Sequence, residues 1–239
     1  MQTGADNRTL AALSAILGYA VLIGFVDNFV QVIAAEAGLW QFHFLRSCIA
    51  VVLFALAMVP LGLRLRPVSL KAVVARSVVH GGALIIYFGC LAFLTVAQAA
   101  AGLFTAPIWV LLFGRLVYGH VLGPARIAAV VVGFVGVMLV LTPGADEPLG
   151  WASVLPVAAG MLYALGNIAT REWCARESAE TLTLGFFLAL GLAGLVGLLV
   201  LAIAPQAPAG GADGFILRGW VTPSPVFWFW TTVQAAGSM

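Results

Sequence analysis

The chain has 239 residues, of which 63% are hydrophobic and only 8% are charged. An ordinary soluble domain is about 45 to 50% apolar and about 25% charged, so this composition excludes a soluble globular protein and predicts a protein that crosses a membrane several times. The formal net charge is only +2, and the basic residues form no run that could follow a phosphate backbone, so we expect no nucleic-acid partner.

Eight apolar segments follow one another along the chain, and a spanning helix requires about 20 mainly apolar residues. We expect complete spans at 12–33, 40–62, 72–94, 97–117, 124–141, 150–170 and 181–204, and an eighth, incomplete span that begins near Pro223. The Gly- and Pro-rich stretch at 205–222 indicates a loop. The predicted fold class is therefore an all-α polytopic membrane protein.

Positive charges orient these spans, because Lys and Arg are enriched on the cytoplasmic side of a membrane. With a cytoplasmic N-terminus, nine of the eleven Lys and Arg residues fall at cytoplasmic ends. Arg218 lies in an outer loop and Arg46 within a span, while the acidic pair Asp146 and Glu147 lies outside. We expect a multi-pass protein of the inner (plasma) membrane with its N-terminus in the cytoplasm.

A weak internal repeat relates the two halves of the chain. A shift of 139 residues places Asn28 on Asn167 and the second span on the seventh. Because five spans separate equivalent helices, the second copy must cross the membrane in the opposite direction, with a site near the midplane between the copies. We divide the chain into an N-terminal cytoplasmic segment (1–11), a first five-helix repeat (12–142) and an incomplete second repeat (150–239) that holds helices six, seven and part of eight.

The stretch AQAAAGLFTAPIWVLLFGRLVYGHVLGPARIAAVVVGFVGVMLVL, from Ala97 to Leu141, has an Ala-rich helix start, a mid-helix Pro, a short basic turn and a Gly-punctuated last helix. It resembles the paired fourth and fifth helices of the drug/metabolite transporter superfamily, in the EamA-like branch. The resemblance covers about residues 10–204. It implies ten helices in two inverted five-helix repeats, and alternating-access transport of small metabolites, amino acids or drugs.

Two departures from that pattern affect what the resemblance implies. His120 stands where the family commonly has Glu in the turn after the fourth helix. After Pro225 only about 15 residues remain, which gives about 22 Å of helix against a hydrocarbon core of about 30 Å. We therefore expect a fragment or truncated product of a ten-helix protein. An alternative to transport is a non-transporting membrane protein that acts only as an interaction partner or is inactive.

Polar and small side chains recur at helical spacing on several spans, as expected of helices that line a hydrated cavity. The cavity residues that we predict are Asp27, Asn28, Arg46, His80, Tyr87, Gln98, Trp109, Tyr163 and Asn167. Each has a structural alternative, because aromatic rings also pack in cores and amide side chains also form hydrogen bonds between helices. Small residues such as Gly102 and Gly160 equally permit close helix packing.

Asp27 and Arg46 differ from the others, because a charge in the bilayer interior costs at least about 2.5 kcal/mol and needs a partner or water. Both lie roughly 9 Å from the outer ends of consecutive antiparallel spans, which permits an ion pair. Two interpretations of Asp27 stay open: a counter-ion for Arg46, or a substrate or proton site. His80, a residue type that exchanges protons near neutral pH, is a second candidate for proton coupling.

No HExxH, GxSxG or P-loop motif and no pair of aspartates suited to an aspartyl protease is present, so we expect no enzyme activity. The three cysteines have no CxxC spacing, and we expect neither a metal nor a cofactor. The predicted function is a secondary transporter in the lipid bilayer that exports a small-molecule substrate. Proton coupling and a homodimer stay open.

Overall fold

The structure is a computed structural model, and every described element in it is a helix or a turn. The described residues are 2–62, 65–119, 123–141, 151–206 and 212–239. The helices are α1 (Gln2–Asp27), α2 (Val30–Glu36), α3 (Leu39–Leu61), α4 (Leu70–Cys90), α5 (Val96–Leu103), α6 (Ala106–Tyr118), α7 (Pro124–Leu141), α8 (Trp151–Glu172), α9 (Ala179–Ile203), α10 (Ala212–Ile216) and α11 (Pro225–Gly237). His120, Asp146 and Glu147 lie outside the described residues.

Five described helical segments are long and apolar enough to cross a membrane. They are Leu13–Glu36, Leu39–Met58, Leu70–Cys90, Val96–Val117 and Ala179–Ile203, and Pro124–Val140 is a shorter apolar helix. The predicted span at 150–170 coincides with α8, and α11 begins at Pro225, close to the expected start of the eighth span. The prediction of an all-α polytopic membrane protein is confirmed.

Two predicted spans are broken near their middles, where we expected continuous helices. In the span at 12–33, α1 ends at Asp27, and the Asn28 side chain donates to the Gly24 carbonyl oxygen at 2.7 Å. A side-chain amide that bonds to the backbone competes with the helical ladder, which accounts for the break.

The span at 97–117 breaks between α5 and α6, just before Pro107. Proline has no N–H to donate, and its ring clashes with the carbonyl four residues earlier, so it favours the first turn of a helix over the interior. Pro107 therefore starts a new helix here. The sequence pattern alone suggested a kinked but continuous span.

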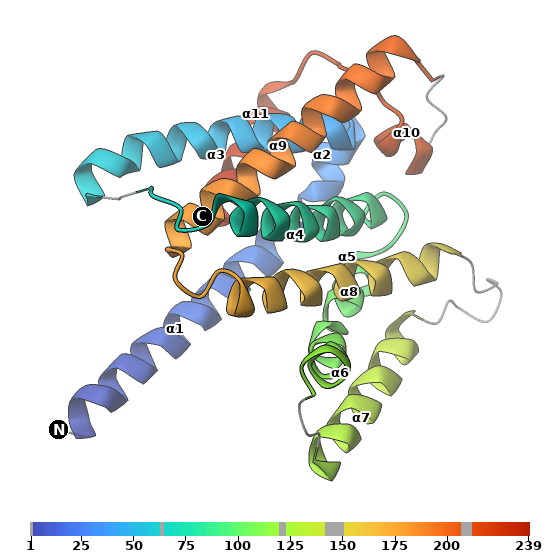
Figure 1. Ribbon diagram of the computed structural model, residues 1–239. Coiled ribbons are helices and arrows are strands. Elements are labelled where there is room, and N and C mark those ends of the chain that lie inside the picture. Colours follow the sequence, from blue (N-terminus) through green and yellow to red (C-terminus); the bar gives the residue numbers. More distant parts are fainter. Residues whose placement is uncertain (1, 63–64, 120–122, 142–150, 207–211) are drawn as a thin grey trace.

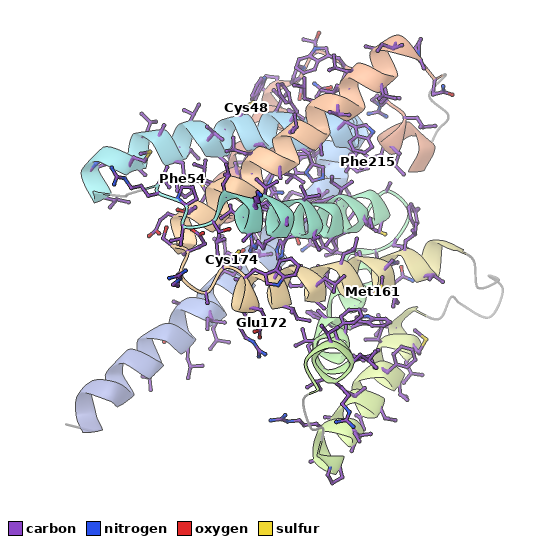
Figure 2. The ribbon with its side chains drawn as sticks, in the orientation of Figure 1. Cys48, Phe54, Met161, Glu172, Cys174 and Phe215 are labelled. Atoms are coloured by element: carbon purple, nitrogen blue, oxygen red, sulfur yellow. The ribbon has the colours of Figure 1, made fainter. Side chains whose placement is uncertain are left out.

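The helices pack as a bundle in which α4 occupies a central position. Figure 1 shows α4 lying between α9 and α8, and α9 crossing α3. α11 packs against α1, α2 and α3. α5 and α6 pack against α8, and α7 contacts both α5 and α6. The largest core cluster joins α2, α3, α4, α10 and α11, and includes Phe42, Phe88, Phe227 and the buried Phe215 of α10 (Figure 2).

Backbone contact between α5, its following turn and α8 depends on glycine. A Cβ atom built on Gly160 would lie 2.1 Å from the Gly102 carbonyl oxygen and 2.3 Å from Thr105 Oγ1. A Cβ atom on Gly102 would lie 2.2 Å from the Pro156 carbonyl carbon. No side chain fits at these distances, so these two glycines serve close helix packing.

We predict that Gly160→Ala lowers the stability of the protein by about 1 to 3 kcal/mol, because the added methyl group forces α8 away from backbone atoms that cannot rotate aside. The control is Gly133→Ala on α7, where an added Cβ meets nothing within 4 Å. Thermal unfolding of the purified variants in detergent measures the difference. Equal unfolding temperatures for the two variants would contradict the close-packing account.

Candidate transport cavity

A cavity of about 280 Å³ lies among α1, α3, α4, α5, α8, α9 and α11. Its charged and hydrogen-bonding lining includes Asp27, Arg46, Arg76, His80, Tyr87 and Tyr163. Five of the nine predicted cavity residues are thus brought together, although they come from four different helices and lie up to 136 positions apart, from 27 to 163. Such a cavity, with mixed polar and aromatic walls inside a membrane-spanning bundle, can hold a small amphipathic molecule.

Asp27, the last residue of α1, is buried, with 7% of its surface exposed. Its Oδ2 accepts a hydrogen bond from the Tyr87 hydroxyl at 2.7 Å, and its Oδ1 accepts one from Gln234 Nε2 at 3.0 Å. Hydrogen bonds to a carboxylate are stronger than neutral ones, and they offset part of the cost of burying its charge. Asp27 therefore connects α1 to α4 and α11.

Arg46 on α3 is only 3% exposed. Its Nη2 donates to Ser238 Oγ at 2.5 Å, and its guanidinium carbon lies 5.1 to 5.7 Å from the ring centres of Phe42, Phe88 and Phe187. Cations are attracted to ring faces at this range, more strongly when they are desolvated. Nε and Nη1 of Arg46 have no hydrogen-bond partner among the described residues.

The predicted ion pair between Asp27 and Arg46 is absent from the described part of the chain, where no carboxylate oxygen lies within 4.0 Å of an Arg46 nitrogen. The counter-ion interpretation is therefore wrong as a direct contact. Tyr87 and Gln234 occupy the carboxylate, and three phenylalanine rings surround the guanidinium. Both charges nevertheless line the same cavity.

His80 on α4 lies beside two aromatic rings, one on α8 and one on α9. Its ring centre is 4.5 Å from that of Tyr163 and 5.5 Å from that of Phe186. Its Nδ1 has no hydrogen-bond partner among the described residues. A Cβ atom built on Gly166 would lie 2.7 Å from that nitrogen, so only glycine leaves room for the imidazole against α8.

Asn28 and Asn167, which the repeat aligned and the sequence assigned to the cavity, are both exposed and lie outside its lining. The Asn28 amide bonds to the backbone of its own helix, as described above. Asn167 lies on α8 four residues after Tyr163, but it is exposed and is not part of the cavity lining to which Tyr163 belongs. For these two residues the cavity prediction is not supported by the structure.

Gln98 and Trp109 also lie outside the cavity lining. Gln98 forms a capping box with Thr95, in which Thr95 N donates to Gln98 Oε1 at 3.0 Å and Gln98 N donates to Thr95 Oγ1 at 3.2 Å. Trp109 Nε1 donates to Thr105 Oγ1 at 3.1 Å. Gln98 thus caps the start of α5, and Trp109 contacts the N-cap residue of α6 at the break in the span.

Five polar cavity residues were not in the predicted set: Tyr19, Arg76, Thr183, Gln234 and Ser238. Arg76 precedes His80 by four residues and Tyr19 precedes Asp27 by eight, so helical periodicity places each on the same face as its neighbour. Ser238 follows Gln234 by four residues, so the same periodicity pairs these two.

The fold and the cavity define a class: a multi-pass helical membrane protein with a polar and aromatic cavity inside its bundle. The EamA-like transporter family matches residues 10–142 of this chain. The chain belongs to the EamA-like transporter family, as its resemblance to that branch implied.

Several curated proteins are similar to this chain. A protein of Rhizobium johnstonii named riboflavin transporter is 34% identical over 146 residues, which is 61% of this chain and 47% of that protein. A Vibrio cholerae protein of the same name is 32% identical over 85 residues, 36% of this chain and 28% of that protein. An uncharacterized transporter of Helicobacter pylori is 25% identical over 202 residues, 81% of this chain and 66% of that protein. The chain thus spans about half the length of the Rhizobium relative.

We predict that Tyr87→Phe destabilises the protein by about 1.5 to 3 kcal/mol, because the buried Asp27 carboxylate loses one of its two hydrogen bonds. Tyr163→Phe is the matched control, since the Tyr163 hydroxyl makes no hydrogen bond to a described residue. Thermal unfolding in detergent reports the effect. A Tyr87→Phe variant as stable as Tyr163→Phe would show that Asp27 does not depend on this bond.

Proposed function

We propose that the protein is a secondary transporter of the inner membrane, with a cytoplasmic N-terminus, that moves a small molecule by alternating access through the cavity between Asp27 and Arg46. The observation that carries the proposal is the cavity itself: buried charged groups from several spans face one space. Intramembrane charges are costly and usually mark a substrate or ion pathway. Membership of the EamA-like transporter family supports the same function.

The packing of the helices supports the inverted repeat on which alternating access would depend. In the proposed repeat, α1 and α2 correspond to α8, α3 to α9, and α4 to α11. The contact between α4 and α8 then corresponds to that between α11 and α1, and α4 with α9 corresponds to α11 with α3. The contact between α3 and α9 maps onto itself, because these two helices correspond to each other. A pseudo-two-fold axis between two repeats produces this pattern of equivalent contacts, and the substrate site lies near that axis.

Riboflavin, or another planar heteroaromatic metabolite, is the substrate class that we propose first. Two relatives are named riboflavin transporter. The rings of Tyr19, Tyr87, Tyr163, Phe88 and Phe186 line the cavity, and aromatic faces suit a flat ring system. Amino acids and drugs are the broader classes that the family resemblance implies. The proposed direction is export, and the direction is a separate outcome of the transport assay.

Within this proposal Asp27 and His80 are the groups that would bind substrate or carry a proton, because both reach the cavity and both can change charge. Arg46 would supply positive charge. Tyr87 would hold Asp27 in place through their hydrogen bond.

We predict that proteoliposomes containing the protein move labelled riboflavin, and that Asp27→Asn and His80→Ala each reduce the initial rate by roughly tenfold or more, as expected when a charged contact is lost. Asn167→Ala is the control, because Asn167 is exposed outside the cavity. Uptake and efflux are measured with a pH gradient of either sign.

Unchanged flux in both variants would remove Asp27 and His80 from the mechanism. Absence of flux for riboflavin and for a panel of amino acids and cationic dyes would favour the alternative, a membrane protein that acts through partners.

A further inference from the structure

More basic than acidic side chains line the cavity. Among the residues that line it, Asp27 is the one acidic side chain, whereas Arg46 and Arg76 are both basic. Arg76 donates to Thr170 Oγ1 at 2.9 Å and to the Leu182 carbonyl oxygen at 3.2 Å. Asp27 already accepts two hydrogen bonds. Of these two arginines, Arg46 thus has fewer hydrogen-bond partners among the described residues.

A buried guanidinium with two free nitrogens is costly, because each N–H group was bonded to water before it was buried. The phenylalanine rings around Arg46 attract its positive charge but accept no conventional hydrogen bond. An acceptor on a ligand in the cavity that Arg46 lines would replace a lost hydrogen bond.

We propose that Arg46 recognises an acceptor group of an aromatic solute, which would accept a hydrogen bond from Nε or Nη1. These two nitrogens lie on different edges of the guanidinium, so one acceptor group would bind one of them. This inference rests on the proposed function, because it assigns a ligand to the same cavity. The aromatic part of the solute would lie against the nearby rings of His80 and Tyr163, whose centres are 4.5 Å apart. A carboxylate and a carbonyl group of a cyclic imide both provide such an acceptor.

The test is calorimetric binding of three probes to the full chain in nanodiscs, with protein-free nanodiscs as the blank. Naphthoate carries a carboxylate, naphthalenemethanol has the same ring without one, and riboflavin carries an imide edge. We expect naphthoate to bind at least about tenfold more tightly than naphthalenemethanol, which is the effect of a charge-assisted hydrogen bond. In Arg46→Gln that preference should disappear, and in the control Asn167→Ala it should remain.

Equal binding of naphthoate and naphthalenemethanol to the wild-type protein would overturn the inference, whether or not Arg46→Gln folds. A preference that survives in folded Arg46→Gln would overturn it as well. Riboflavin binding that falls with naphthoate binding in Arg46→Gln supports the imide edge as a second ligand. Binding without flux in proteoliposomes would reject the proposed transport function and leave this inference intact.

A second, independent observation concerns two glutamates at opposite ends of the bundle. Glu177, in the connection after α8, accepts hydrogen bonds from Val68 N at 2.9 Å and Ser69 N at 2.6 Å, at the start of α4. Glu36, the last residue of α2, accepts a hydrogen bond from Ser224 Oγ, which is the N-cap of α11. Each carboxylate thus holds the first residues of a helix.

The two contacts are equivalent under the proposed inverted repeat. The Glu36 contact joins the end of α2, in the first repeat, to the start of α11, in the second repeat. The Glu177 contact joins the connection after α8, in the second repeat, to the start of α4, in the first repeat. Glu36 lies just before α3 and Ser69 lies after its end, so the 23 residues of α3, about 34 Å of helix, separate the contacts. They therefore lie towards opposite faces of the membrane.

We infer that Glu36 and Glu177 are two opposed latches, each of which must release for the cavity to open on its own side. Loss of one latch then shifts the population towards the state that is open on that side, since it removes contacts made only in the closed arrangement. Further bonds close the Glu36 end, where Gln41 and Val221 exchange hydrogen bonds of 2.7 and 3.0 Å. We therefore expect the larger shift from loss of Glu177.

The test uses Thr183→Cys, a cavity position, in a chain whose three native cysteines are replaced by alanine. Labelling by a membrane-impermeant maleimide is measured from each side in vesicles of defined orientation, without substrate. Glu177→Gln should accelerate labelling from the Glu177 side by up to about tenfold, and Glu36→Gln should accelerate it from the other side.

Glu172→Gln is the matched control, because Glu172 is the last residue of α8 (labelled in Figure 2), five positions before Glu177, and its hydrogen-bond partner among the described residues is the neighbouring Arg171. The inference is overturned if Glu36→Gln and Glu177→Gln act on the same side. It is also overturned if neither variant exceeds Glu172→Gln. Both results are independent of whether any solute is transported.

Discussion

A carboxylate inside a membrane-spanning bundle must take its hydrogen bonds from the chain, and for Asp27 these come from α4 and α11. That requirement constrains three helices at once. Asp27 and Tyr87 must face the interior of the bundle, and Gln234 must reach Asp27 from the far end of the sequence. The cavity lies beside this junction, and Asp27, Tyr87 and Gln234 are all part of its lining.

Glycines determine how closely the helices approach these charges. Gly166 leaves room for His80 against α8, and Gly197 leaves room for the Trp40 ring, whose Cδ2 atom would be 2.2 Å from a Cβ atom at that position. Without a hydrophobic force between helices in lipid, close van der Waals packing of this kind is a main source of association. The polar contacts of the cavity are thus positioned by small residues that do not themselves touch it.

The sequence allowed the order and approximate limits of the apolar segments to be predicted, because apolar length is a strong signal in a membrane protein. It did not reveal the breaks after α1 and α5, or the short helix α10 in the expected loop at 205–222. Helical periodicity and the cost of buried charge also brought Asp27, Arg46, His80, Tyr87 and Tyr163 into one site. Helical periodicity assigned Gln98 to the cavity, whereas the spacing of Thr95 and Gln98 is the S/T-x-x-E/Q signature of a capping box, which periodicity does not test. Equal depth likewise predicted that Asp27 and Arg46 share a region. Depth carries no information about rotation around the helix axis, which decides whether two charges touch.

In the proposed mechanism, solute binding is coupled to closure of the cavity because the chain satisfies the Asp27 carboxylate more fully than the Arg46 guanidinium. In the described part of the chain, Asp27 accepts two hydrogen bonds, whereas Arg46 keeps two unbonded nitrogens. In the proposed mechanism a solute with a suitable acceptor removes that cost only while the cavity is closed around it, because water satisfies the same nitrogens when the cavity is open. Such a solute binds the closed state more tightly than the open ones, and this difference in affinity is what a ligand needs to shift a conformational equilibrium. The side on which the cavity reopens then depends on which of the two contacts breaks, that of Glu36 or that of Glu177.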